Sequence, residues 1–211
     1  MALVGKKFPN ITVDAISFMG DDLRINVLEE ATKNNKKVLL FWYPKDFTFV
    51  CPTELHAFQA ALQEFESRNT MVIGASCDTN EVHFAWLNTP KNAGGIEGVT
   101  YPILADTTRN LSAALDILDS EWVYDEAMND EILEGSNVTF RATYLIDETG
   151  KIFHESVNDM PLGRNVQEYL RLIDAYTHVQ TNGEVCPANW EKGKDAMNAD
   201  RNSTASYLAS H

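Results

Sequence analysis

One stretch of the sequence places a cysteine where its sulfur could act as a nucleophile. Cys51 is followed directly by Pro52 and, three residues on, by Glu54, at the start of an amphipathic helical pattern. Proline suits the first position of a helix, and a carboxylate at this spacing can close a capping box. We therefore expect Cys51 at a helix N-terminus, where unpaired N–H groups and the helix dipole favour the thiolate over the thiol.

A thiolate alone gives only a modest acceleration, because a more acidic thiol yields a weaker nucleophile. A fast thiol enzyme also needs donors that stabilise the charge moving onto its substrate. Thr48 lies three residues before Cys51 and can share its helical turn, and Arg141 on a later predicted strand is the best candidate for a positive charge. The alternative is that Cys51 is a small buried hydrophobic residue, as most free cysteines are, but a helix start beside a proline is unusual for that role.

The other two cysteines differ in their surroundings. Cys77 ends a predicted buried strand and is expected to be structural, whereas Cys186 lies on a polar arm with little core to fill. Cys186 is therefore a credible redox partner for Cys51. Neither the cysteines nor the five histidines have the spacing of a metal site, so we expect no bound metal.

Hydrophobic periodicity predicts the elements that must position these residues. Strands that alternate with helices, followed by a hairpin late in the chain, indicate an α/β domain with a mixed sheet. Beyond Thr181 the pattern fades into a polar arm. The predicted strands span 36–43, 71–76, 101–104, 140–146 and 151–156, and the predicted helices span 53–67, 81–88, 107–118 and 165–178.

Length and charge narrow the class of protein. The 211 residues fit one domain with an appended tail. With 31 acidic and 17 basic residues the formal charge is −14, which repels phosphate backbones, so we expect no nucleic-acid partner. No apolar run approaches the ~20 residues of a membrane span, and no stretch resembles a secretory signal. These features, together with three scattered cysteines, lead us to expect a cytoplasmic, thiol-reducing setting.

An acidic segment runs from Asp116 to Glu134. It contains eight acidic residues and no lysine or arginine. A metal-binding loop or a docking patch would also be acidic, but the spacing lacks the order of a calcium loop. We therefore expect a solvated surface insertion.

Four motifs of this sequence resemble those of the typical 2-Cys peroxiredoxins, close to the alkyl hydroperoxide reductase C branch. The motif around Cys51 matches without a gap, and the motif around Cys186 follows in the expected order. The matching segments are Asp-Phe-Thr-Phe-Val-Cys-Pro-Thr-Glu-Leu at 46–55, His-Phe-Ala-Trp-Leu-Asn-Thr-Pro at 83–90, Gly-Arg-Asn-Val at 163–166 and Gly-Glu-Val-Cys-Pro-Ala-Asn-Trp at 183–190. The resemblance implies a thioredoxin-like fold, with a central mixed β-sheet flanked by helices over residues 1–165 and a C-terminal helix and arm over 166–211.

The resemblance also implies roles for individual residues. Cys51 becomes the peroxidatic thiolate, which attacks the O–O bond of hydrogen peroxide or an organic hydroperoxide and forms a sulfenic acid. Pro44 shields the site, Thr48 hydrogen-bonds the thiolate and the peroxide, and Arg141 stabilises the thiolate and the departing oxygen. A supporting ion pair joins Glu54 and Arg164.

The implied cycle needs no metal or organic cofactor. Cys186 from the other protomer of a dimer condenses with the sulfenic acid to form an intersubunit disulfide, which thioredoxin or a flavoprotein disulfide reductase then reduces. The implied assembly is a homodimer, linked by that disulfide, and further a decamer built as a ring of five dimers. The expected roles are antioxidant defence and cell redox homeostasis.

Two other functions are weighed against the peroxidase. A redox-regulated chaperone or signalling adaptor, in which oxidation switches assembly, is compatible with the same cysteines. A thioredoxin-like disulfide reductase is disfavoured because the sequence has no C-x-x-C pair.

Overall fold

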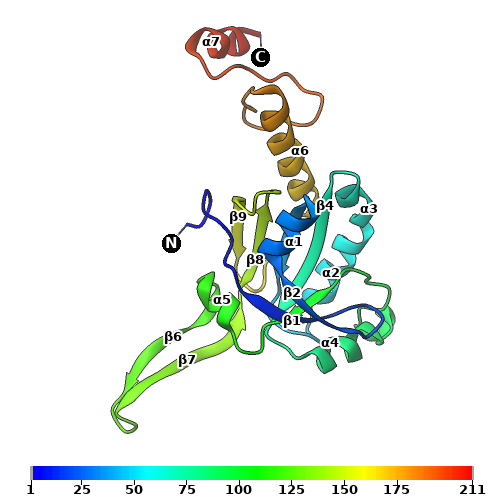
Figure 1. Cartoon of the computed structure of the whole chain (residues 1–211), viewed down its shortest axis with the longest axis vertical. Coiled ribbons are helices and arrows are strands. Elements are labelled where there is room, and N and C mark those ends of the chain that lie inside the picture. The colour runs from blue at the N-terminus through cyan, green and yellow to red at the C-terminus, as the bar shows by residue number, and fades with distance from the viewer. Residues whose placement is uncertain (1, 211) are drawn as a thin grey trace. The chain divides into compact units, whose positions relative to one another are not determined.

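At the centre of the fold is a seven-stranded sheet, shown in Figure 1 by a computed structural model that describes residues 2–210. The strand order is β2-β1-β5-β4-β3-β8-β9. β4 pairs in parallel with β3 and β5, and the other neighbours are antiparallel, so the predicted mixed sheet is confirmed. The strands are β1 (Thr12–Ile16), β2 (Asp22–Asn26), β3 (Lys37–Trp42), β4 (Thr70–Ser76), β5 (Ile103–Ala105), β8 (Arg141–Ile146) and β9 (Ile152–Asn158).

The chain divides into two units, the first ending at Arg164 and the second beginning at Asn165. The second unit contains α6 (Val166–Asn182), which extends the predicted helix, and α7 (Arg201–Ser210), which no pattern predicted. Among the described residues, no helix is long and apolar enough to cross a membrane. The helices of the first unit are α1 (Val27–Asn34), α2 (Cys51–Ala60), α3 (Leu62–Glu66), α4 (Asn80–Leu87), α5 (Asn110–Ala114) and the 3-10 helix η1 (Lys91–Ala93).

The central strand β3 is buried along its whole length, because both faces of the sheet are covered. Alternate side chains of a strand point to opposite faces. Leu40 and Trp42 join the core cluster that includes residues of α1 and α5. On the other face, Phe41 stacks on Phe58 of α2 with ring centroids 4.1 Å apart. The end of β3 is therefore held firmly, and the loop that follows it leads directly to Cys51.

The helix predicted over 53–67 is two helices in the structure, because α2 begins at Cys51 and the helical path is interrupted at Ala61. The middle of α2 is fastened to a neighbouring loop by side-chain contacts. His56 Nε2 lies 3.1 Å from the carbonyl oxygen of Gly95, and the Tyr101 hydroxyl donates to the carbonyl oxygen of Leu55 at 2.8 Å. From residue 55 onward, α2 is thus tied to the body of the first unit.

The acidic segment forms a separate two-stranded hairpin of β6 (Leu118–Asp125) and β7 (Asp130–Thr139), which extends away from the sheet in Figure 1. Its acidic residues are exposed or half-buried, in keeping with a solvated surface segment, but the paired strands were not predicted. The helix predicted over 107–118 is wrong. α5 covers only five residues, and Asp116 then takes a left-handed φ of 57°, which turns the chain out of the helical path toward β6.

Candidate active site

Cys51 is the first residue of α2, so the predicted position at a helix N-terminus is confirmed. Val50 precedes it as a cap that offers no side-chain hydrogen bond, and Pro52 occupies the first turn. The helix dipole at this end therefore faces the sulfur without competition from a capping side chain. Cys51 is fully buried, and low local polarity strengthens every charge interaction that the sulfur makes.

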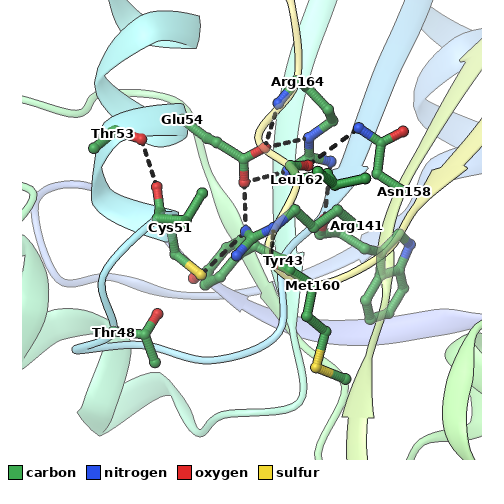
Figure 2. Close-up of polar contacts among 12 residues, drawn as sticks. Tyr43, Thr48, Cys51, Thr53, Glu54, Arg141, Asn158, Met160, Leu162 and Arg164 are labelled. Atoms are coloured by element: carbon green, nitrogen blue, oxygen red, sulfur yellow. Dashed lines mark hydrogen bonds and ion pairs between the residues drawn. The ribbon is translucent and has the colours of Figure 1, made fainter.

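Arg141, the first residue of β8, supplies the positive charge beside this sulfur (Figure 2). Its Nη1 lies 3.3 Å from Cys51 Sγ and 2.7 Å from Glu54 Oε2. Its Nε donates to the carbonyl oxygen of Met160 at 2.6 Å. Three partners thus fix the plane of the guanidinium, which is 4% exposed. Because the group is held before any substrate arrives, it needs no reorganisation to stabilise charge on the sulfur or on a substrate atom beside it.

Glu54 joins the two arginines of the site. Arg164 Nε lies 2.8 Å from Glu54 Oε1, which is the ion pair that the resemblance implies, and Arg164 Nη2 lies 2.9 Å from Oε2. Arg164 Nη1 also donates to the carbonyl oxygens of Trp42 and Ala142, each at 2.9 Å. One buried carboxylate therefore partly neutralises two buried guanidinium groups and sets the orientation of Arg141.

Two predicted residues lie on the loop between β3 and α2. Pro44 is buried at the start of this loop, and Thr48 is half-buried near Cys51 (Figure 2). The Thr48 hydroxyl donates to the carbonyl oxygen of Lys45 at 2.9 Å. The structure therefore differs from the expected hydrogen bond between Thr48 and the thiolate, since the single hydroxyl proton is directed at the backbone in this conformation.

Several contacts of this site carry no signal in the sequence. The carbonyl oxygens of Met160, Trp42 and Ala142 orient the arginines, and a backbone carbonyl has no residue type to recognise. His83, which had no ligand spacing, is buried against Asp46 of the active-site loop, with Nδ1 2.7 Å from Oδ2. Within residues 2–210, no group of three or more His, Cys, Asp or Glu side chains is arranged to hold a metal ion.

Cys186 belongs to the second unit, where its sulfur lies 3.7 Å from the carbonyl oxygen of Ala175. Burial raises the pKa of the Cys186 thiol, with Arg171 opposing the shift and Glu184 adding to it. Cys186 is therefore a protonated thiol near neutral pH. The two cysteines thus meet different electrostatic environments, because Cys51 has a guanidinium in direct contact.

Cys77 is expected to be the least reactive thiol of the folded protein. Burial raises its pKa to about 11, with Asp106 and Asp78 adding to the shift and Ser112 and Arg109 opposing it. At pH 8 only about one such thiol in a thousand is ionised, and the thiolate is the reactive form. Iodoacetamide labelling followed by peptide mass spectrometry should leave Cys77 unmodified at pH 8 and modify it readily in the denaturant-unfolded chain. Equal labelling rates in the two states would contradict this assignment.

Comparison with known proteins gives matches along most of the chain. Residues 4–155 match the model of the AhpC/TSA family, and residues 175–210 match the model of the C-terminal domain of 1-Cys peroxiredoxin. The second model is named for proteins with one active cysteine, whereas this chain carries Cys186 within the matched segment.

Similar proteins of known name agree with this assignment. Alkyl hydroperoxide reductase C of Helicobacter pylori is 41% identical over 98% of this chain and 96% of its own length, and peroxiredoxin-1 of Gekko japonicus is 36% identical over 100% and 97%. The crystal structure of the reduced 2-Cys peroxiredoxin of Plasmodium vivax superposes with a TM-score of 0.87 at 36% identity, covering 99% of this chain and 100% of that one. The chain therefore belongs to the AhpC/TSA family of peroxiredoxins and is a thiol-dependent peroxidase.

Proposed function

We propose that this peroxidase reduces hydrogen peroxide and organic hydroperoxides at Cys51. The thiolate attacks one peroxide oxygen, the O–O bond breaks, and a proton goes to the departing oxygen, which leaves as water or an alcohol. The sulfur loses two electrons and becomes a sulfenic acid. The observation that carries the proposal is the 3.3 Å contact between Arg141 Nη1 and Cys51 Sγ. A fixed cation at this position can stabilise both the attacking sulfur and the oxygen that leaves, and Pro44 and Thr48 on the adjacent loop shield the site and orient the peroxide.

The second step is condensation with Cys186 of the other protomer in a dimer. Its thiol attacks the sulfenic sulfur, a disulfide forms, and water leaves. A dithiol reductant can then reduce this disulfide and restore both thiols. The position of Cys186 in a matched peroxiredoxin segment supports this role. We propose thioredoxin or a flavoprotein disulfide reductase as the reductant, because each can reduce a protein disulfide while its own dithiol is oxidised to a disulfide. This cycle operates in a compartment that keeps thiols reduced, which favours the cytoplasm.

Exposed aromatic side chains support self-association of the chain. Phe49 is 93% exposed, Phe47 is 52% exposed and Phe84 is 40% exposed. Aromatic residues are enriched at protein–protein interfaces relative to the rest of the surface. We propose a homodimer that carries the intersubunit disulfide and a ring of five dimers, a decamer, in which these side chains are covered.

Electrophoresis without reductant tests the proposed cycle. One equivalent of hydrogen peroxide should convert the protein into a disulfide-linked dimer, which dithiothreitol returns to the monomer. Cys51→Ser should abolish both dimer formation and peroxide consumption. Cys186→Ser should keep the first oxidation but stop turnover with thioredoxin, since the sulfenic acid has no partner thiol.

Cys77→Ser is the matched control for these variants, because it removes a thiol that lies outside the site. It should form the linked dimer as the unmodified protein does. A Cys51→Ser protein that consumes peroxide at the normal rate would contradict the proposal, and a dimer that persists in Cys186→Ser would contradict the assigned disulfide.

A further inference from the structure

The loop between β3 and α2 is anchored by a buried carboxylate. Asp46 is 3% exposed, whereas its neighbours Lys45 and Phe47 are exposed. Asp46 Oδ2 lies 2.7 Å from His83 Nδ1, and Asp46 Oδ1 accepts a hydrogen bond from the Tyr43 hydroxyl at 2.7 Å. The backbone N–H of Asp46 donates to Asp78 Oδ2 at 2.9 Å. Both the side chain and the backbone of Asp46 thus hold the loop in place.

Counting hydrogen-bond donors and acceptors shows how many protons the Asp46 carboxylate and the His83 ring hold between them. His83 Nε2 lies 3.2 Å from the carbonyl oxygen of Leu104, and a carbonyl only accepts, so Nε2 carries a proton. The short contact between Nδ1 and Asp46 Oδ2 then needs one proton between the two atoms. Loss of that proton would either leave two lone pairs facing each other or move the Nε2 proton to Nδ1 and break the bond to the Leu104 carbonyl, and a second proton would place two hydrogens in one gap. The pair therefore fits its surroundings with a single shared proton.

The groups around this pair come from several elements. Tyr43 follows β3, and Asp78 follows β4. His83 lies on α4, and its ring sits between Asp46 and the backbone of β5. Burial raises the pKa of the Asp46 carboxyl, contact with His83 and with the Tyr43 hydroxyl lowers it, and Asp78 raises it. Burial also raises the pKa of Tyr43 well above its usual value, with Asp46, Asp78 and Tyr101 adding to the shift, so Tyr43 remains a donor to Asp46.

We propose that Asp46 and His83 are positioning residues for the oxidation of Cys51: their shared proton keeps Pro44 and Thr48 in place beside the sulfur. The proposal rests on the peroxidase reaction proposed above. Four residues separate Asp46 from Cys51. Among them, Phe47 takes a left-handed φ of 53° and packs its ring against Trp86 with centroids 5.8 Å apart, and Phe49 is 93% exposed. The Thr48 hydroxyl bonds within the loop, to the carbonyl oxygen of Lys45, and the hydrogen bonds that tie the loop to α4 and to the end of β4 are those of Asp46.

Two substitutions at Asp46 distinguish a role in positioning the active-site loop from a role in folding. In Asp46→Asn, the amide can accept from Tyr43 and donate to a neutral His83 Nδ1, so the bonds persist without the shared ionisable proton. Asp46→Ala removes them. We expect Asp46→Ala to slow single-turnover oxidation of Cys51 by hydrogen peroxide about tenfold or more, and Asp46→Asn to stay within about threefold near pH 7.

The pH dependence is the decisive measurement, because a purely structural role would not change it. The ratio of the Asp46→Asn rate to the unmodified rate is compared across pH. We expect this ratio to vary with pH, because the unmodified pair holds an ionisable proton between His83 Nδ1 and Asp46 Oδ2 and the variant has an amide there. Asp106→Asn is the matched control, since Asp106 is 1% exposed and caps α5, and it should give a flat ratio.

Amide hydrogen exchange of residues 45–50, measured without peroxide, tests the loop independently of the chemistry. Exchange should quicken in Asp46→Ala and His83→Ala and stay slow in Asp46→Asn. The proposal is overturned if exchange and oxidation are the same in Asp46→Ala as in the unmodified protein, or if Asp46→Asn gives a flat ratio across pH. If the unmodified protein does not react with peroxide, the proposed function fails, and the exchange result still decides the positioning role.

Discussion

Arg141→Ala is expected to slow the oxidation of Cys51 by hydrogen peroxide about a hundredfold to a thousandfold, the usual cost of removing one preorganised donor from a site of charge development. The guanidinium is buried and lies 3.3 Å from the sulfur, so its removal takes away the cation that contacts the sulfur. Single-turnover oxidation, followed by mass spectrometry of the modified cysteine, measures the effect directly.

Arg141→Lys is the informative companion variant. It keeps a positive charge but not the planar fork that reaches Cys51, Glu54 and Met160 together, so we expect a rate between those of Arg141→Ala and the unmodified protein. Arg24→Lys serves as the control, since Arg24 forms an exposed ion pair far from these contacts. An Arg141→Ala protein that is folded, as judged by its melting temperature, and oxidises at the unmodified rate would contradict the assigned role.

Glu54→Gln is expected to cause the largest loss of stability among single substitutions in the site. Glu54 faces Arg141 and Arg164, whose side chains are 4% and 1% exposed. Removal of the carboxylate charge leaves two buried cations close together, and breaking a buried ion pair costs about 3–5 kcal/mol. For a chain of this size that corresponds to a decrease in melting temperature of about 6–20 °C.

Calorimetry of Glu54→Gln beside Glu66→Gln measures this effect. Glu66 lies exposed on α3, so its substitution should leave the melting temperature nearly unchanged. Glu54→Asp should fall between the two, because it keeps the charge but shortens the reach to the arginines. Equal melting temperatures for Glu54→Gln and Glu66→Gln would show that the carboxylate does not stabilise the arginine pair.

The sequence predicted the parts of the fold that have one dominant hydrophobic signal. β3, β4 and β8 are buried on nearly every residue and read as continuous apolar runs. β1, β2 and the β6–β7 hairpin mix polar and apolar residues on short strands, because one or both faces are exposed, and no pattern identified them. α7 has no buried residue and therefore no hydrophobic stripe to detect.

In the candidate site too, features with a local sequence signal could be predicted, and contacts between residues far apart in the chain could not. Cys51 could be placed at a helix start from Pro52, which favours the first turn of a helix. The capping box expected of Glu54 is wrong, because its carboxylate binds Arg141 and Arg164 instead. The contact between Cys51 and Arg141 joins residues 90 positions apart, and spacing alone does not predict such a contact. His83 carried no local signal either, since its partner Asp46 is 37 residues away and only the packing of α4 against the sheet brings them together.

The sparse bonding of the first turn of α2 has a consequence for the catalytic cycle. Pro52 has no N–H, Val50 offers no side-chain cap, and the turn is closed by bonds from Thr53 and Glu54 to the carbonyl oxygen of Val50. Conversion of the thiolate to a sulfenic acid removes the negative charge that Arg141 attracts. Because Glu54 is held by both arginines, we expect the chain to hinge just before it after oxidation, so that the sulfur swings outward while the carboxylate and its arginines stay assembled for the next turnover.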